Sequence, residues 1–214
     1  MIDWYLNLTE EPQISDNITS YINKLKPHKA AQWSYKSKDM NNFKDQLMEE
    51  CKRIQKCRCV YCGLSFTHRL IDREHFVAKG EKRGKPEFMF NTKNLFASCA
   101  YCNRRIKGQK SVLLNYDQDY SKCEFNIIHP LLDNPNDYLS YKNDSKGRQV
   151  KIEAKPSLNN KGEETIKFFK LATVEMRKAR RGYLAEIEDD EDDDDVDQPT
   201  PKSRSKAASG YKPR

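Results

Sequence analysis

Apolar residues recur along this chain with the two periods that distinguish helices from strands. Over residues 40–54 they return every three or four positions, which predicts an amphipathic helix with one buried face. A shorter group over residues 18–25 has the same spacing and ends before Pro27, which cannot continue a helix. A second long helix is predicted over residues 163–184.

Four short segments have the composition of β-strands. They are residues 70–77, 94–99, 138–142 and 148–154. A basic, glycine-containing loop separates the first two, and a turn-forming sequence separates the last two, so each pair predicts a small hairpin. We therefore expect an α+β fold of small hairpins with flanking helices.

The overall composition limits the size of the core. The chain has 214 residues, of which 36% are hydrophobic, and its mean hydropathy is −0.97. This is enough for one domain with appendages and a modest core.

The start of the chain lacks the basic and apolar regions of a secretory signal, and no apolar run approaches the roughly 20 residues of a membrane span. A cytoplasmic protein is expected.

The net charge of +7 conceals a strong asymmetry. Residues 186–197 contain ten acidic residues and no basic one, whereas residues 198–214 contain five basic residues and no acidic one. Residues 1–185 therefore hold 34 basic and 22 acidic residues, a net charge of +12. A body this basic favours a polyanionic partner, although ordinary solubilising charge is the alternative. The tail, residues 186–214, is expected to be disordered, and its acidic block could mimic nucleic acid and occupy the basic body.

Four of the seven cysteines form two Cys-x-x-Cys pairs. The pairs are Cys59/Cys62 and Cys99/Cys102. Together they can close a tetrahedral thiolate shell around a structural zinc, which leaves no position for a reacting water. The alternatives are four buried thiols or two disulfides, and Cys57 could replace Cys59. The remaining cysteines are expected to be reduced, packed thiols: Cys51, Cys57 and Cys123.

Polar residues that can bind a metal or transfer a proton cluster between and beside the cysteine pairs. The first predicted strand contains Asp72-Arg73-Glu74-His75, Asn94 begins the second, and Asn103 opens a short basic helix that Gly108 is expected to end. Carboxylate and amide oxygens suit magnesium or manganese, and an imidazole suits a general base. A charged edge strand is the plainer interpretation of the first cluster.

These residues resemble the HNH endonuclease family, which has a ββα-metal core. The resemblance rests on Glu74-His75, Asn94-Leu95 and the string Cys99-Ala100-Tyr101-Cys102-Asn103. It implies a zinc-stapled HNH core that cleaves phosphodiester bonds in nucleic acid, DNA or RNA. His75 would be the general base, Glu74 and Asn103 would bind the catalytic ion, and Asn94 would orient the His75 loop. Asp72 is a weaker candidate for the metal site.

Basic residues surround this string and are expected to contact phosphates. They are Arg73, Lys79, Lys82, Arg83, Lys85, Arg104, Arg105 and Lys107. For the loop between the strands, a solvated surface is an equal alternative.

The downstream sequence widens the resemblance to residues 55–185. His129-Pro-Leu-Leu-Asp-Asn-Pro, a hairpin and a final helix resemble the HNH proteins of bacterial anti-phage systems, namely the PtuB component of Septu and retron-associated relatives. That family acts with an ABC/SMC-type ATPase, which could dock around Trp4 and Tyr5 or on residues 125–154. His129 itself is expected to be structural.

Four regions are expected from these observations: an N-terminal segment (1–55), the nuclease core with its zinc site (56–112), a hairpin and helix packed on that core (113–185), and the tail (186–214). The alternatives to a defence nuclease are a non-catalytic zinc-ribbon binding module and a stand-alone restriction or homing enzyme.

Overall fold

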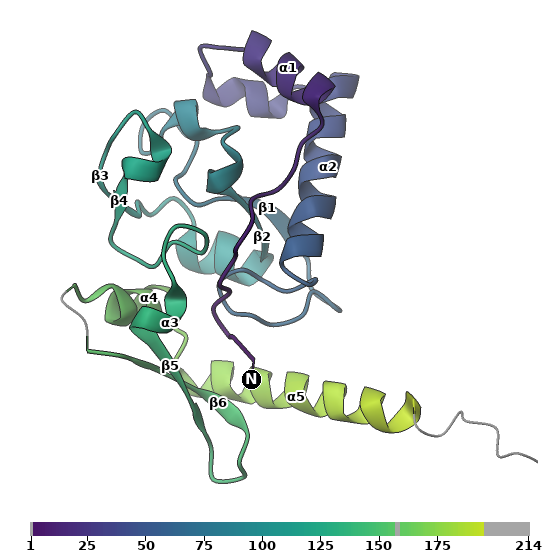
Figure 1. Cartoon of the computed structure of the whole chain (residues 1–214), viewed down its shortest axis with the longest axis vertical. Coiled ribbons are helices and arrows are strands. Elements are labelled where there is room, and N and C mark those ends of the chain that lie inside the picture. Colours follow the sequence, from purple (N-terminus) through teal and green to yellow (C-terminus); the bar gives the residue numbers. More distant parts are fainter. Residues whose placement is uncertain (1, 157–158, 195–214) are drawn as a thin grey trace, which may run out of the picture.

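A computed structural model describes residues 2–156 and 159–194, with only the backbone for residues 189–194. The strands in these ranges form three separate two-stranded antiparallel sheets, with helices between and around them (Figure 1). The expected α+β class is therefore confirmed, in the form of small hairpins. No helix in the same ranges is long and apolar enough to cross a membrane.

The α-helices of the described residues are α1 (Asp16–Lys24), α2 (Lys38–Ile54), α3 (Pro135–Tyr138), α4 (Lys161–Phe169) and α5 (Val174–Asp194). The strands are β1 (Ile71–His75), β2 (Leu95–Cys99), β3 (Leu113–Asn115), β4 (Glu124–Phe125), β5 (Leu139–Asn143) and β6 (Gln149–Ala154). A π-helical segment, Tyr101–Lys107, follows β2. Short 3-10 turns lie at Ala30–Ser34, Pro86–Phe88, Thr92–Asn94 and Tyr120–Lys122.

The sequence predicted α1, α2 and the hairpins β1–β2 and β5–β6. It did not predict α3 or the pair β3–β4, which are four, three and two residues long. Elements this short contain less than two periods of any hydrophobic pattern, so periodicity cannot reveal them.

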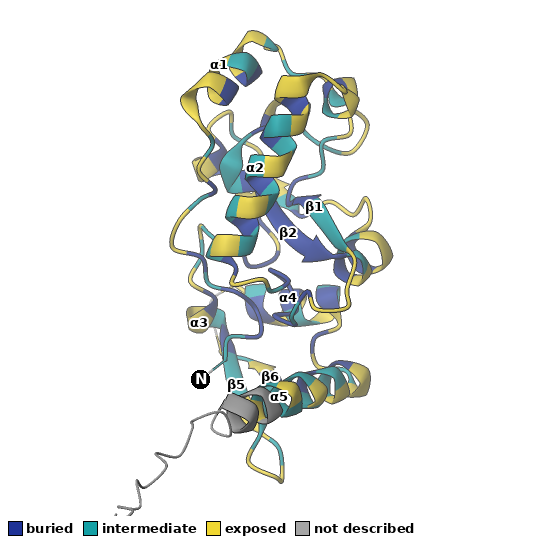
Figure 2. Cartoon of the chain, turned by 90° about the vertical axis from the view of Figure 1, so that its right-hand side faces the viewer, coloured by how far each residue is buried: buried dark blue, intermediate teal, exposed yellow. Residues whose placement is uncertain are grey.

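Helix α2 packs its apolar face against the β1–β2 hairpin. Ser37 caps its first turn, because the side-chain oxygen accepts a hydrogen bond from the Met40 N–H. Met40, Phe43, Leu47 and Cys51 are buried along one side of the helix, as their spacing predicted. Figure 2 shows the opposite side of α2 exposed.

The buried side chain of Gln55 ties the end of α2 to β2. The Gln55 amide donates a hydrogen bond to the Ala97 carbonyl (2.7 Å) and accepts one from the Ala97 N–H (2.8 Å). All five residues of β2 are buried. These bonds fix the β1–β2 hairpin relative to α2 and to the loop that follows it.

The β1–β2 hairpin leads directly into a helical turn. Ile71 pairs with Cys99 and His75 with Leu95. The Gly108 N–H then donates to the Asn103 carbonyl, five residues earlier, at 2.7 Å, which is the spacing of a π turn. Gly108 ends the segment with φ 53°, a conformation that glycine adopts readily. The expected order of strand, strand and short helix is present, with a π rather than an α pitch.

The chain begins beside α5 and runs from there toward α1 (Figure 1). Leu6 donates its N–H to the Val60 carbonyl, and the Trp4 and Tyr5 rings are fully buried. Neither ring reaches the surface, so an ATPase that docks around Trp4 and Tyr5 would have to contact other residues of this segment.

The helix predicted over residues 163–184 is broken into α4 and α5. Lys170 ends α4 in a left-handed conformation (φ 55°), and Leu171 turns into the core, where it is fully buried. The Thr173 hydroxyl oxygen then accepts the Met176 N–H and begins α5. The continuous helix was a wrong prediction, because burying Leu171 favoured a break that the apolar spacing did not reveal.

Helix α5 also extends beyond its predicted end. Residues 186–194 continue it, so the expectation of disorder is wrong there; extending an existing helix costs much less than starting one. Residues 195–214 lie outside the described residues.

Of the three cysteines expected to be packed thiols, Cys51 and Cys123 are buried, whereas Cys57 is exposed. Cys57 has φ 52° in the turn after α2.

Candidate functional site

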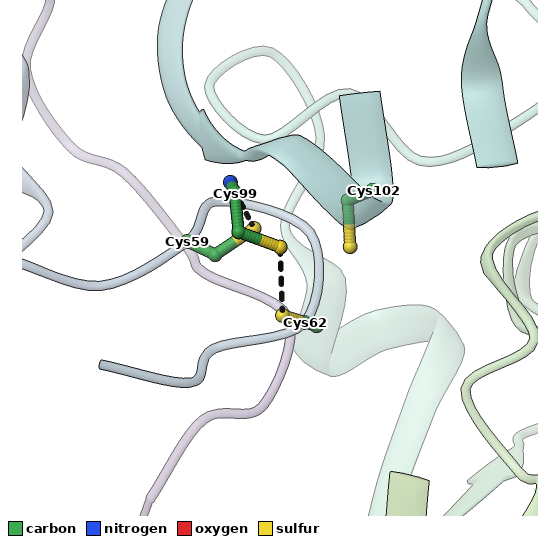
Figure 3. Close-up of side chains that lie close together, drawn as sticks. All are labelled: Cys59, Cys62, Cys99 and Cys102. Carbon is green, nitrogen blue, oxygen red and sulfur yellow. Dashed lines mark hydrogen bonds between the residues drawn. The ribbon is translucent and has the colours of Figure 1, made fainter. Parts of the chain in front are cut away.

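Four cysteine side chains converge on one buried point (Figure 3). The Sγ atoms of Cys59, Cys62, Cys99 and Cys102 all lie within 4.8 Å of one another, and the Cys62 and Cys99 sulfurs are 4.0 Å apart. A tetrahedral zinc with bonds of about 2.3 Å separates its sulfurs by about 3.8 Å. A disulfide would need about 2.05 Å, and all seven cysteines are free. The cluster therefore fits a metal ion such as zinc.

Three separate segments deliver these cysteines. Cys59 and Cys62 lie in the loop after α2, Cys99 ends β2, and Cys102 lies in the π-helical segment. The Cys99 N–H points at the Cys59 sulfur at 3.3 Å (Figure 3). An N–H donor of this kind stabilises a negatively charged thiolate. A bound ion would thus join the α2 loop to the hairpin and to the helical segment.

A cavity of about 760 Å³ lies beside the β1–β2 hairpin. It brings together eight of the residues that the sequence singled out for chemistry or phosphate binding: Glu74, His75, Asn103 and Lys107, together with Arg73, Lys79, Lys82 and Arg83. Asn94, Lys85, Arg104 and Arg105 do not line it.

His75 is 6% exposed and lines this cavity. Its Nε2 lies 3.1 Å from the Met89 carbonyl oxygen, and the Trp33 ring packs against the imidazole at 4.4 Å. A carbonyl can only accept, so Nε2 carries the proton of the neutral ring and Nδ1 is the unprotonated nitrogen. Burial lowers the pKa of His75 to about 3, assisted by the positive charges of Lys79 and Lys107.

Glu74 is buried in an ion pair that the sequence did not predict. Its Oε1 lies 2.8 Å from the Lys107 ammonium and accepts a hydrogen bond from the Tyr61 hydroxyl at 3.0 Å. Lys107 is 2% exposed and also donates to the His75 carbonyl at 2.9 Å. Burial raises the pKa of Glu74, and the Lys107 ammonium acts in the opposite direction. Lys107 thus holds Glu74 and His75 in place.

Asn103, which lines the cavity, is in direct contact with Asp72 on β1. The Asn103 amide donates to Asp72 Oδ2 at 3.1 Å, and the Arg104 guanidinium pairs with the same carboxylate. The amide oxygen of Asn103 is the atom that could face a cation. Glu74 and Asn103 are the two expected ligands of a catalytic ion. Glu74 contacts Lys107 and Tyr61, whereas Asn103 contacts Asp72.

Asn94 lies behind His75, fully buried, and fixes the backbone there. Its amide donates to the carbonyls of Val77 (3.1 Å) and Phe88 (3.0 Å), and its oxygen accepts the Val77 N–H at 2.6 Å. The same oxygen accepts from the Tyr120 hydroxyl at 3.0 Å. Asn94 therefore fixes the backbone of Val77, two residues after His75.

A histidine completes this buried network. His129 Nδ1 accepts the N–H groups of Leu131 and Leu132, so its Nε2 carries the proton and donates to the Tyr120 oxygen at 3.0 Å. His129 is fully buried, as expected of a structural residue. Tyr120, which joins His129 to Asn94, was missed because an isolated tyrosine in a polar stretch carries no sequence signal.

The other basic residues differ in how freely they can meet a ligand. Lys82, Arg83 and Arg105 are exposed. Arg73 pairs with Asp45 at 3.1 Å, and the Lys85 ammonium lies 4.0 Å from the centre of the Tyr116 ring.

Comparison with known proteins assigns no family to the chain. No protein-family model matches it, and no curated protein is significantly similar in sequence. The functional interpretation therefore rests on the residues and their geometry.

The cysteine cluster predicts that Cys102→Ser loses bound metal and unfolds the β1–β2 region, because a structural zinc contributes on the order of 10 kcal/mol to folding. Elemental analysis of the wild-type protein should find one zinc per chain, and thermal unfolding followed by circular dichroism should show the loss of stability. Cys57→Ser is the matched control, because Cys57 is exposed and outside the cluster. A metal-free Cys102→Ser protein that unfolds like wild type would contradict a structural metal.

His129 predicts a specific dependence of stability on pH. Burial, together with the charge of Lys161, lowers its pKa to about 3 from an ordinary value of 6.5. The unfolded chain therefore binds a proton more readily, so this contribution is complete above about pH 6.5 and is lost as the pH falls toward 3. Urea unfolding at pH 7 and pH 5 should show a shallower decline for His129→Asn than for wild type. His68→Gln, at an exposed site, should keep the wild-type decline; an unchanged slope in His129→Asn would exclude this origin.

Proposed function

We propose that this protein is an HNH-type endonuclease that hydrolyses phosphodiester bonds in nucleic acid. The observation that carries the proposal is the His75 imidazole. It is neutral, oriented by the Met89 carbonyl, and placed in a cavity lined by basic residues. Such a ring can take a proton from water at Nδ1 while its Nε2–H stays on the carbonyl.

The cavity supplies the positive charge that a phosphodiester requires. Lys79 is half-buried against the Trp33 ring at 5.9 Å, and Lys82 and Arg83 are exposed on the same loop. Exposed basic side chains hold phosphates through salt-dependent contacts, and these carry little information about base sequence. The loop would therefore position the backbone of the substrate and leave base recognition to other surfaces.

Glu74 and Asn103 are the proposed ligands of a catalytic magnesium or manganese ion. Magnesium is commonly held by one or two carboxylates, with water and substrate phosphate completing the shell, so one carboxylate and one amide oxygen fit. Glu74 would offer Oε2, because Oε1 is shared by Lys107 and Tyr61. When bound, such an ion stabilises charge on the scissile phosphate and the leaving oxygen. Asn94 would keep the backbone after His75 in register.

A non-catalytic zinc module that binds nucleic acid or protein is the second candidate, and specific contacts favour it. The Glu74–Lys107 ion pair is buried, and Asp72 is satisfied by Asn103 and Arg104. These bonds give Glu74, Asp72 and Asn103 a structural role that does not require catalysis. The two candidates differ in whether magnesium or manganese promotes cleavage.

His75→Ala should reduce the rate of cleavage by about a hundred- to ten-thousand-fold, the usual loss when a general base is removed. The assay follows nicking of single- and double-stranded DNA and of RNA with magnesium or manganese, beside measurements of zinc content and thermal unfolding. His68→Ala is the control, since His68 is an exposed histidine outside the cavity. A folded His75→Ala protein that cuts at the wild-type rate would refute the assignment. Wild-type protein that binds but never cuts would favour the non-catalytic module.

We further propose, from the resemblance over residues 55–185, that the nuclease serves anti-phage defence with an ABC/SMC-type ATPase. A basic nuclease needs restraint in its own cell, and a partner subunit could provide it. Co-expression with an ATPase encoded beside this chain, followed by size-exclusion chromatography and cleavage assays, should give one complex with regulated activity. Full activity of the isolated chain with no co-eluting ATPase would instead indicate a stand-alone restriction or homing enzyme.

A further inference from the structure

Helix α5 carries a fully buried arginine with an incomplete set of partners. Arg180 is 0% exposed, and its Nη1 donates to the Val150 carbonyl at 3.0 Å. Its Nε and Nη2 have no hydrogen-bond partner among the described residues. A buried charged group left unpaired is strongly destabilising, so these two N–H groups indicate a missing negative charge.

A second arginine lies on the same aromatic ring. The guanidinium carbons of Arg58 and Arg180 lie 5.8 Å and 5.5 Å from the centre of the Trp4 indole. Arg58 donates only to carbonyls, those of Gly63 and Asp3, each at 2.6 Å. Neither arginine has an ion pair with a carboxylate in the described part of the chain. Two largely buried positive charges thus share one indole without a direct ion pair, and the Asp3 carboxylate acts on Arg58 only from a distance.

The cysteine cluster is the neighbour that can supply the missing charge. Gly63, directly after Cys62, is so close to Arg58 and Trp4 that an added Cβ would lie 2.8 Å from the Arg58 Nη2. Burial lowers the pKa of Arg180 to about 10, and the charges of Cys62 and Cys102 act in the opposite direction. Both arginines therefore lie in the electrostatic field of the cluster.

We propose that Arg58 and Arg180 are the counter-charges of the metal-bound cysteine cluster. A divalent zinc with four thiolates has a net charge of −2, and two guanidinium groups neutralise it. The unpartnered Nε–H and Nη2–H of Arg180 would turn toward the thiolate sulfurs, which accept hydrogen bonds when charged. This role does not depend on the nuclease proposal, since it concerns metal retention alone.

The proposal makes α5 part of the metal site. Arg180 belongs to α5, whereas all four cysteines lie between residues 59 and 102, so the counter-charge links the end of the described chain to its centre. Tyr183, one turn further along α5, packs edge-on against Trp4 at 5.8 Å. Loss of the metal would leave two buried cations without an anion and weaken the packing of α5.

The test is the rate at which zinc passes from the full-length protein to a chromogenic chelator. Outer-shell partners of a metal site typically contribute 10- to 100-fold to metal affinity, so Arg180→Met should release zinc about 10-fold faster or more. Lys178→Met, at an exposed position of the same helix, is the control and should match wild type. Equal release from Arg180→Met and wild type would overturn the proposal.

Arg180→Lys separates charge from packing, because it keeps the positive charge with a shorter side chain. Its zinc release should fall between wild type and Arg180→Met, and release as fast as Arg180→Met would show that charge is not the cause. If Arg180→Met does not fold, hydrogen exchange of the wild-type protein provides the test. Chelation of zinc should speed exchange across residues 174–188, and unchanged exchange there would again refute the proposal.

Discussion

The convergence of four cysteines is the constraint on which the rest of this structure depends. It joins the loop after α2, the end of β2 and the π-helical segment at one point. Because β1 pairs with β2, the position of His75 follows from where Cys99 is held. With only 36% hydrophobic residues, the chain has a modest apolar core, and a metal ion bound at this junction would add stability that side-chain burial alone would otherwise have to supply.

Behind the hairpin, a fully buried hydrogen-bond network fixes the backbone next to His75, the candidate catalytic residue. His129, Tyr120 and Asn94 form a chain in which each donor has one acceptor, and it ends on the backbone of Val77, two residues after His75. Buried polar networks rigidify a structure when every member is satisfied. The order of donors also determines the proton positions, because the Leu131 and Leu132 N–H groups require an unprotonated Nδ1 on His129.

The sequence was most informative where a local pattern determines the structure. Cysteine spacing predicted the cluster, apolar spacing predicted α2, and strand-like composition with connecting loop and turn residues predicted the two longer hairpins. The sequence was least informative where contacts between residues far apart in the chain determine the structure. The break at Lys170 depends on burial of Leu171, and the ion pair between Glu74 and Lys107 joins residues 33 positions apart in the chain. Arg180 is one of several basic residues in its stretch of the sequence, and only its burial distinguishes it from them.

Burial also distinguishes two kinds of positive charge in this basic chain. Lys82 and Arg83 line the cavity and are exposed, so an anion can reach them from solution. Arg180 is closed off from solvent, so its anion has to belong to the protein itself. Four thiolates on a bound divalent ion would carry this charge, and Cys62 and Cys102 are among the groups that act on Arg180 electrostatically. Solvent accessibility therefore divides the basic side chains into two groups. An anion from solution can reach the exposed side chains, whereas a buried one such as Arg180 needs a counter-charge within the protein.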